Sequence, residues 1–244
     1  MRGVSAPTWE NYVARQFDQR VDAFPKQIAF DDPRLVALKQ AFPDWRGKRV
    51  LDLGCGSGRY WPALKRSGAR LVGLDLSARS LEFASPENPR IIGSVARLPF
   101  PESSFDCLLL LELLQHLKTP ELALNEALRL LKPHGKLVII DRNPLSLDAT
   151  RPWLPSLLVK QIDQRRGLWM YPSRGPVQES WSRPGRWQKA SGLLVSGWRL
   201  EHVESSEESS RKIRRLIPLA RPFYCLTGTR SAIGPKLQHL SGAS

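Results

Sequence analysis

Short apolar runs alternate with amphipathic segments through the middle of the chain. Runs typical of strands cover residues 48–53, 71–75, 90–93, 105–111 and 136–141. Segments with helical spacing of apolar residues lie between them, at residues 60–67, 77–84 and 119–131. Strands that alternate with helices favour a parallel sheet with helices on both faces, so the pattern predicts an α/β core.

The pattern changes towards both ends. Residues 9–24 and 35–42 have helical spacing, and prolines bound these segments. Beyond Asp141, residues 157–166 and 184–196 are interpreted as helices, and residues 198–204 and 222–228 as two further strands. Together with the central runs, these strands predict a Rossmann-like, seven-stranded, mostly parallel sheet flanked by helices on both faces.

Three glycines follow the first apolar run, in Val50-Leu51-Asp52-Leu53-Gly54-Cys55-Gly56-Ser57-Gly58. Glycines between a strand and a helix let a ligand approach the backbone closely. The spacing differs from the dinucleotide fingerprint, and the loop lacks the Lys and Ser or Thr of a P-loop. Either a nucleotide site or a tight turn without ligand explains it.

Asp75 ends the next apolar run. An acid at that point can accept two hydrogen bonds from the diol of a ribose. The alternative is an ordinary solvated aspartate at a strand end. The combination of Asp75 with the glycine loop favours the nucleotide site.

At this point the sequence resembles the class I S-adenosylmethionine-dependent methyltransferases, in particular the type-11 group related to quinone-biosynthesis methyltransferases. Ordered motifs carry the resemblance, and they span residues 50–58, 73–77, 98–106, 112–117 and 126–137. The resemblance implies S-adenosylmethionine as cofactor, S-adenosylhomocysteine as product and no metal. It says little about the acceptor of the methyl group.

The resemblance also implies roles for individual residues. Gly54, Gly56 and Gly58 would line the methionine and ribose, with Cys55 inside the loop, Asp52 beneath it, and Asp75 on the ribose hydroxyls. Leu76, Ser94, Val95 and Ala96 would surround the adenine, and Glu112 and Leu113 would lie near the methionine and the sulfonium. The family commonly has an acid where this chain has Ser94, so weaker anchoring of the adenine is expected.

Candidates for catalysis and acceptor binding are less distinctive. His116 is the candidate general base, with a purely structural role as the alternative. Asp141 and Arg142 follow the fifth central strand, where open α/β sheets bind ligands. Further candidates for the acceptor site lie in the segment that follows: Trp153, Trp169, Tyr171 and Arg183. Alternatively, the tryptophans form a small core of their own.

These interpretations divide the chain into five parts. They are an N-terminal helical cap (1–47), an S-adenosylmethionine-binding core (48–141), an acceptor-side insertion or lid (142–189), a C-terminal helix with the last strands of the same sheet (190–230), and a flexible tail (231–244). The expected function is methyl transfer to an oxygen or carbon of a small-molecule or lipid-like acceptor.

Composition and charge leave two alternatives open. The net charge is +14, and residues 151–244 hold 16 basic but only 6 acidic side chains. A basic surface can bind RNA or an anionic membrane transiently, or simply keep a protein soluble. No recognisable RNA-binding motif is present, so an RNA methyltransferase is the less favoured alternative, beside a non-catalytic cofactor-binding protein.

Cellular location follows from what the chain lacks. The three cysteines, Cys55, Cys107 and Cys225, are far apart, which argues against disulfides and a zinc motif. There is no apolar run of membrane-spanning length, and no apolar core of a signal peptide near Met1. We therefore expect a cytoplasmic protein, with membrane association as an option.

Overall fold

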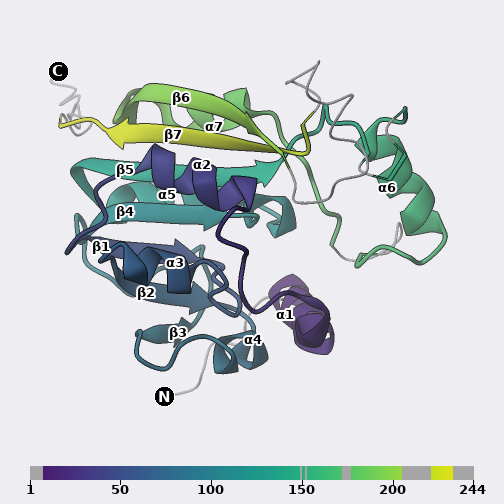
Figure 1. Ribbon diagram of the computed structural model, residues 1–244, viewed down its shortest axis with the longest axis horizontal. Coiled ribbons are helices and arrows are strands. Elements are labelled where there is room, and N and C mark those ends of the chain that lie inside the picture. Colours follow the sequence, from purple (N-terminus) through teal and green to yellow (C-terminus); the bar gives the residue numbers. More distant parts are fainter. Residues whose placement is uncertain (1–7, 149, 152, 172–176, 205–220, 233–244) are drawn as a thin grey trace, which may run out of the picture.

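The computed structural model describes residues 8–148, 150–151, 153–171, 177–204 and 221–232 (Figure 1). Seven strands form one sheet: β1 Arg49–Leu53, β2 Arg70–Asp75, β3 Arg90–Ile92, β4 Phe105–Leu111, β5 Leu131–Arg142, β6 Val195–Val203 and β7 Phe223–Arg230. Their order is β3-β2-β1-β4-β5-β7-β6. All pairs among the first five strands are parallel, and β7 is antiparallel to both of its neighbours. The predicted seven-stranded, mostly parallel sheet is confirmed.

Helices cover both faces of this sheet. The α-helices are α1 Thr8–Arg20, α2 Pro33–Ala41, α3 Trp61–Arg66, α4 Ala78–Glu82, α5 Pro120–Leu130, α6 Ser156–Arg165 and α7 Pro184–Ser191. Three short 3-10 helices are η1 Val21–Ala23, η2 Leu114–His116 and η3 Gly192–Leu194. In Figure 1, α2 and α3 lie in front of the sheet, and α5 and α7 lie behind it.

Strand alternation builds a core on each face. Along β4, Leu108 and Leu110 pack into the cluster that contains α5 and α7, while Leu109 and Leu111 pack into the cluster that contains α2 and α3. All four side chains are at most 7% exposed. Because successive side chains of a strand point to opposite faces, a strand covered on both faces is apolar throughout.

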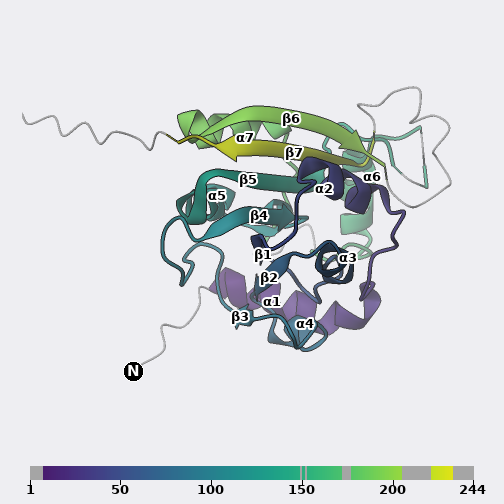
Figure 2. The ribbon, with the colours of Figure 1, turned by 60° about the vertical axis from the view of Figure 1, so that its left-hand side comes forward.

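Two elements lie beside the sheet at the carboxyl ends of its parallel strands. Both ribbon views place α1 next to α4, and Figure 1 shows α6 beyond the end of β5 (Figures 1 and 2). The carboxyl ends of parallel strands are where open α/β sheets bind ligands. α1 and α6 therefore flank the region in which a site is expected.

Some predicted boundaries are wrong. The helix expected to reach Ser196 ends at Ser191, because Gly192 adopts a φ of 53° and Val195 already pairs with Arg230 in the sheet. β5 begins at Leu131 rather than Lys136, since Leu131 pairs with Phe105. The predicted flexible tail, residues 231–244, lies almost entirely outside the described residues.

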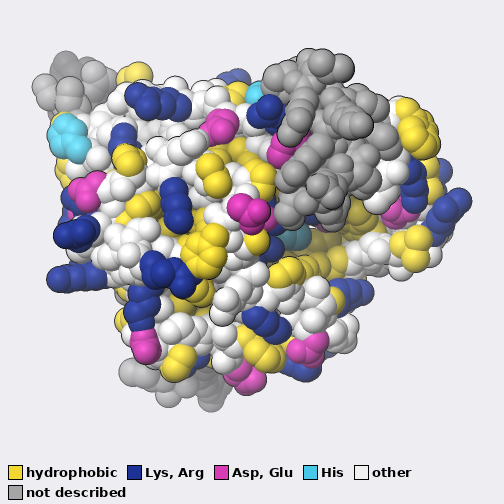
Figure 3. All heavy atoms as spheres, viewed as in Figure 1, with side chains coloured by type: hydrophobic (Ala, Val, Ile, Leu, Met, Phe, Trp, Pro, Cys, Tyr) yellow, Lys and Arg dark blue, Asp and Glu magenta, His cyan; other side chains and the backbone are white. Residues whose placement is uncertain are grey.

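Charge is dispersed on the face that Figure 3 shows. Lys and Arg side chains are interspersed there with acidic and apolar ones. Among the described helices, none is both long and apolar enough to cross a bilayer. Within the same residues, His, Cys, Asp and Glu side chains form no group of three that could hold a metal ion. All three cysteines are buried and free.

Candidate active site

The glycine loop after β1 has a backbone that other residues would strain. Gly54, Gly56 and Gly58 have φ of 67°, 53° and 67°, the left-handed region that glycine occupies without a steric penalty. A Cβ on Gly54 would lie 2.6 Å from Leu113 Cδ1, whereas no described atom lies within 4 Å of the corresponding position on Gly56. The loop thus packs on one side and leaves space beside Gly56.

Asp75 fastens this loop to the end of β2. Its Oδ2 accepts a hydrogen bond from the Gly56 N–H at 2.8 Å, and its Oδ1 accepts one from the Ser77 N–H at 2.8 Å. Burial raises the pKa of Asp75, against the effect of these backbone donors. Two carboxylate oxygens offer about four acceptor positions, so the group can accept further hydrogen bonds.

Asp52 lies under the loop and is buried. Its Oδ2 accepts a hydrogen bond from Trp61 Nε1 at 2.9 Å. Burial raises its pKa to about 7, although the indole hydrogen bond acts in the opposite direction. Asp52 therefore takes up a proton close to neutral pH.

The loop and the carboxyl ends of β2, β4 and β5 enclose a cavity of about 270 Å³. Strand order separates its lining into two ends. Residues at or just after the carboxyl ends of β1, β2 and β3 form the loop end: Gly54, Gly56, Asp75, Leu76 and Val95. Lining residues beyond Leu113 form the distal end: Gln115, His116, Arg142, Trp169 and Glu179. Side chains of α1, including Val13 and Phe17, close a further wall.

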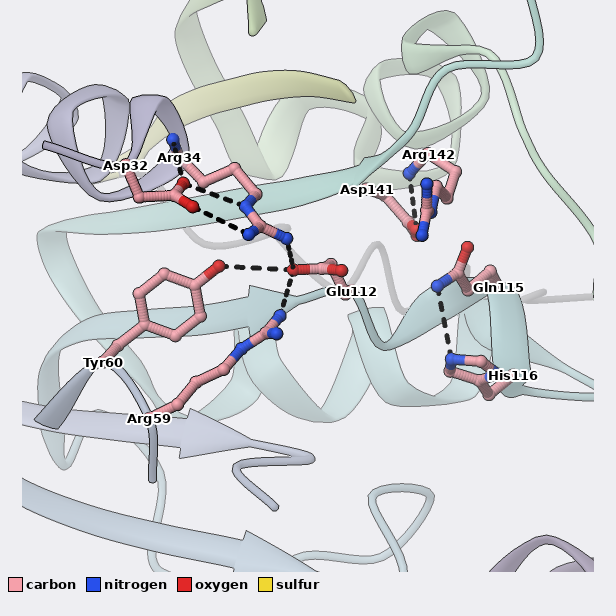
Figure 4. A network of polar contacts seen from close by, with 9 residues as sticks. All are labelled: Asp32, Arg34, Arg59, Tyr60, Glu112, Gln115, His116, Asp141 and Arg142. Atoms are coloured by element: carbon pink, nitrogen blue, oxygen red, sulfur yellow. Dashed lines mark hydrogen bonds and ion pairs between the residues drawn. The ribbon is translucent and has the colours of Figure 1, made fainter. Parts of the chain in front are cut away.

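Glu112 stands between the two ends and is held by basic side chains (Figure 4). It follows β4 with a φ of 56°. Its Oε1 accepts hydrogen bonds from Arg34 Nη1 at 3.1 Å, from Arg59 Nη2 and from the Tyr60 hydroxyl at 3.3 Å. Burial alone would raise the pKa of Glu112, but Arg59, Arg34 and Arg142 lower it to about 2. The carboxylate is therefore charged throughout the physiological pH range.

His116 is the last residue of η2, and aromatic rings contact its imidazole. Its ring meets Phe17 edge-on at 5.2 Å and Tyr171 at 5.7 Å between centroids. Burial lowers the pKa of His116, so the imidazole is neutral at pH 7. His116 Nε2 lies 3.2 Å from Gln115 Nε2, and the buried Nδ1 has no partner among the described residues.

Tryptophans and a buried lysine surround Glu179 at the distal end. The indole nitrogens of Trp169 and Trp181 each donate to its carboxylate at 2.6 Å. Lys160 is 5% exposed, and its ammonium group donates to the Glu179 backbone oxygen at 2.5 Å. These contacts attach the chain after α6 to the cavity.

Comparison with known proteins identifies the core. A family described as a methyltransferase domain matches residues 51–139. This match covers 89 of the 244 residues of the chain. Two curated relatives are the demethylmenaquinone methyltransferase of Tropheryma whipplei, 36% identical over 39% of this chain, and the ubiquinone biosynthesis O-methyltransferase of Alkalilimnicola ehrlichii, 32% identical over 46%. The matches span 42% and 50% of those two proteins, so the chain aligns with half their length at most.

Solved structures share the fold of this methyltransferase domain. An S-adenosylmethionine-dependent methyltransferase of Thermotoga maritima, described as a possible histamine N-methyltransferase, superposes with a TM-score of 0.63 at 19% identity. The similarity covers 89% of this chain and 99% of that protein. The cyclase SpnF superposes with a TM-score of 0.58 at 17% identity, over 94% of this chain and 98% of its own. At this level of identity the likeness concerns the fold alone.

Most of the predicted site residues meet at this cavity. Those that line it are Asp52, Gly54, Cys55, Gly56, Asp75, Leu76, Val95, Glu112, Leu113, His116, Arg142 and Trp169. The predicted residues that do not line it are Gly58, Ser94, Ala96, Asp141, Trp153, Tyr171 and Arg183. The roles implied for the lining residues stay predictions.

The structure corrects the positions of three predicted acceptor residues. Trp153 is 74% exposed, and Arg183 is an exposed residue that precedes α7. Tyr171 is fully buried in a small cluster with Val13 and Val177, so it supports the cavity wall from behind. The alternative interpretation concerned the tryptophans of this segment and stays a prediction, while Tyr171 packs against Val13 of α1.

Four other predicted residues lie behind the lining. A Cβ on Gly58 would meet Trp61 at 2.7 Å, so this glycine serves packing. Asp141 is buried under Arg142, and Ser94 and Ala96 are joined by a hydrogen bond from the Ala96 N–H to Ser94 Oγ. All four are neighbours of lining residues in the sequence.

Contacts between distant segments were missed. Arg34 and Arg59 meet at Glu112 although they lie 78 and 53 positions from it. Glu10, on α1, is 4% exposed and accepts a hydrogen bond from the Ser94 hydroxyl. Where the resemblance led us to expect an acid at position 94, α1 thus brings a carboxylate to the serine. None of these contacts forms a local motif that could have been found in the sequence.

Proposed function

We propose that this protein is an S-adenosylmethionine-dependent methyltransferase that methylates an oxygen or carbon of a small-molecule acceptor. One observation carries the proposal: the glycine loop and Asp75 meet at one end of a cavity whose other end is lined by polar and aromatic side chains. A methyl donor and its acceptor need such adjoining subsites, because transfer requires them to be held in line.

The loop end fits the cofactor. Open space beside Gly56 allows close approach to the backbone, and the Asp75 carboxylate retains acceptor positions for ribose hydroxyls. Leu76 and Val95 supply apolar walls for a flat base. When bound, S-adenosylmethionine supplies a methyl group activated by its sulfonium.

The contribution of the chain is orientation and exclusion of water. Phe17 of α1 lies against His116, and both side chains line the cavity. A closed apolar wall keeps water from competing with the acceptor. Arg34 and Arg59 bind Glu112 and so fix the position of its carboxylate between the two ends.

We propose His116 as the group that receives a proton from the acceptor. Burial favours the neutral imidazole at pH 7, and its one acceptor nitrogen, Nε2, faces the Gln115 amide N–H, which the hydroxyl of an acceptor would displace. The test is the pH dependence of turnover in wild type and His116→Gln. Loss of the acidic limb of the profile in the variant supports the role, and an unchanged profile contradicts it.

The names of the curated relatives favour a quinone-type ring as acceptor. Binding to RNA and to an anionic membrane surface stay predictions, and both rest on the charge of +14. The shared fold of a cyclase means that the fold alone does not assign methyl transfer, and the non-catalytic alternative stays a prediction.

The proposal is tested by incubating the protein with deuteromethyl-labelled S-adenosylmethionine and a panel of hydroquinones, phenols, sugars and RNA. We expect release of S-adenosylhomocysteine and a mass increase of one labelled methyl group in a small acceptor. Labelled RNA would favour the RNA alternative. Cofactor binding without product on any acceptor would favour the non-catalytic alternative.

A further inference from the structure

The distal end of the cavity carries a cation without a partner. Arg142 ends β5 and lines the cavity. Its backbone N–H donates to Asp141 Oδ1, but its guanidinium has no hydrogen bond or ion pair with any residue of the described chain. Arg59, which also lines the cavity, is by contrast bound to Glu112. A guanidinium has five N–H donors, and in a partly buried position they call for an acceptor.

Aromatic rings hold this guanidinium in place. Its Cζ lies 4.6 Å from the ring centroid of Phe223 and 5.9 Å from that of Trp181. Aromatic faces attract a guanidinium and restrict its orientation. Arg142 is therefore pre-organised without using any of its hydrogen-bond donors.

The nearby carboxylates are engaged elsewhere. Glu112 is bound by two arginines and a tyrosine, and Glu179 accepts from two indoles. Burial raises the pKa of Asp141 to about 8, so its carboxyl is mostly protonated at neutral pH. The donors of Arg142 thus remain available to a ligand.

An unused acceptor lies beside this donor. Gln115 is 4% exposed, and its Oε1 has no hydrogen-bond partner among the described residues. Figure 4 shows this oxygen on the side of Arg142, while the amide nitrogen points to His116. A buried amide oxygen without a donor is costly, and a ligand hydroxyl would satisfy it.

We infer that the distal end binds an aromatic acceptor that carries an anionic oxygen, bound by Arg142, and a hydroxyl on the same ring, which donates to Gln115. Phe17 and Trp169 supply flat apolar walls for such a ring. The planar fork of a guanidinium suits a carboxylate best and also binds a phenolate. This inference rests on the proposed function, because it identifies the class of acceptor.

The test compares ligands that differ in charge. Protocatechuate and protocatechuamide share a ring and two hydroxyls, but only the first carries a carboxylate. Nitrocatechol represents a phenolate, and its ionisation is followed by its absorbance. Each ligand is titrated into wild type, Arg142→Gln and Arg142→Lys, with and without S-adenosylhomocysteine. Arg70→Gln is the matched control, since Arg70 is exposed at the start of β2.

We expect wild type and Arg70→Gln to bind protocatechuate roughly tenfold more tightly than its amide, or to lower the pKa of nitrocatechol by about one unit, the effect of one charged hydrogen bond. The first signal identifies a carboxylate as the ligand group and the second a phenolate. Arg142→Gln should abolish the signal, and Arg142→Lys, which keeps the charge without the fork, should retain part of it.

Several results overturn the inference. They are binding of no probe by wild type, equal affinity for acid and amide together with an unchanged nitrocatechol pKa, or an undiminished signal in both Arg142 variants. Because the titrations are repeated without S-adenosylhomocysteine, the role of Arg142 is decided independently of the cofactor. Failure of S-adenosylhomocysteine to bind would instead contradict the proposed function.

Discussion

Trp61 donates a hydrogen bond from its indole nitrogen to the buried carboxylate of Asp52, at 2.9 Å, directly beneath the glycine loop. The same indole fills the space beside Gly58 and Gly73, where a Cβ would meet it at 2.7 and 2.4 Å. The Trp61 side chain of α3 therefore both binds the Asp52 carboxylate and packs against the backbone at Gly58 and Gly73.

Replacing the indole N–H of Trp61 should destabilise the folded protein. In Trp61→Phe, Asp52 loses its hydrogen bond, and the free energy of unfolding should fall by about 1–3 kcal/mol. The matched control is Trp45→Phe, because Trp45 is equally buried but its indole nitrogen has no partner among the described residues. Urea denaturation compares the two variants. Equal losses would mean that the hydrogen bond to Asp52 contributes nothing.

The loop glycine at Gly54 should tolerate no side chain. A Cβ there would lie 2.6 Å from Leu113, so Gly54→Ala should displace Leu113 and weaken binding of S-adenosylmethionine strongly. Gly47→Ala shares the positive φ but has no described atom within 4 Å of its Cβ position. Gly47→Ala should lower the free energy of unfolding by about 1 kcal/mol through backbone strain and leave binding of S-adenosylmethionine unchanged. Calorimetric titration distinguishes them, and similar binding by both variants would contradict the packing argument.

Glu10 should affect recognition of the adenine. Because Ser94 holds the Glu10 carboxylate next to Val95, we expect Glu10→Gln to reduce the preference for S-adenosylhomocysteine over S-inosylhomocysteine, which lacks the amino group, by roughly tenfold. Asp18→Asn is the control, since Asp18 also attaches α1 to the core, through Ser77. Asp18→Asn should weaken the binding of S-adenosylhomocysteine and of S-inosylhomocysteine by the same factor. An unchanged preference in Glu10→Gln would show that Glu10 only positions α1.

Stability should fall as the pH rises from about 4 to about 8. The folded protein keeps a proton on Asp141 up to a pKa of about 8, whereas the unfolded chain releases it near pH 4. The folded state therefore binds more protons in this window, and each such group lowers the free energy of unfolding by at most about 1.4 kcal/mol per pH unit. Asp141→Asn should flatten the decline, while Asp44→Asn, at an exposed position, should not. Identical slopes in urea denaturation series for wild type and Asp141→Asn would contradict this.

Local motifs made the core predictable. The glycine loop and Asp75 are defined by residues close together in the sequence. The left-handed backbone of the loop favours glycine whatever packs around it, so the motif could be recognised without knowledge of distant contacts. The strands were recognisable because those covered on both faces are continuously apolar. The end of α7 could not be recognised from the sequence, because either Gly192 or Gly197 could end the helix. Pairing of Val195 with Arg230 selects the first.

Contacts between distant segments were not predictable. Nothing around Arg34 indicates that it reaches Glu112, because only the packing of α2 on the sheet brings them together. Trp153 was expected at the acceptor site, but burial cannot be predicted for a segment without periodicity. The distal end depends on such contacts, and for that reason Arg142 became informative only once its surroundings were known.

The central claim is that the loop end binds S-adenosylmethionine through Asp75. The most direct measurement is calorimetric titration of S-adenosylmethionine and S-adenosylhomocysteine into wild type, Asp75→Ala and the charge-matched control Asp44→Asn. The account predicts micromolar binding by wild type and control, on the order of −8 kcal/mol, and a marked loss in Asp75→Ala. Absence of binding by folded wild type, or undiminished binding by folded Asp75→Ala, would contradict it.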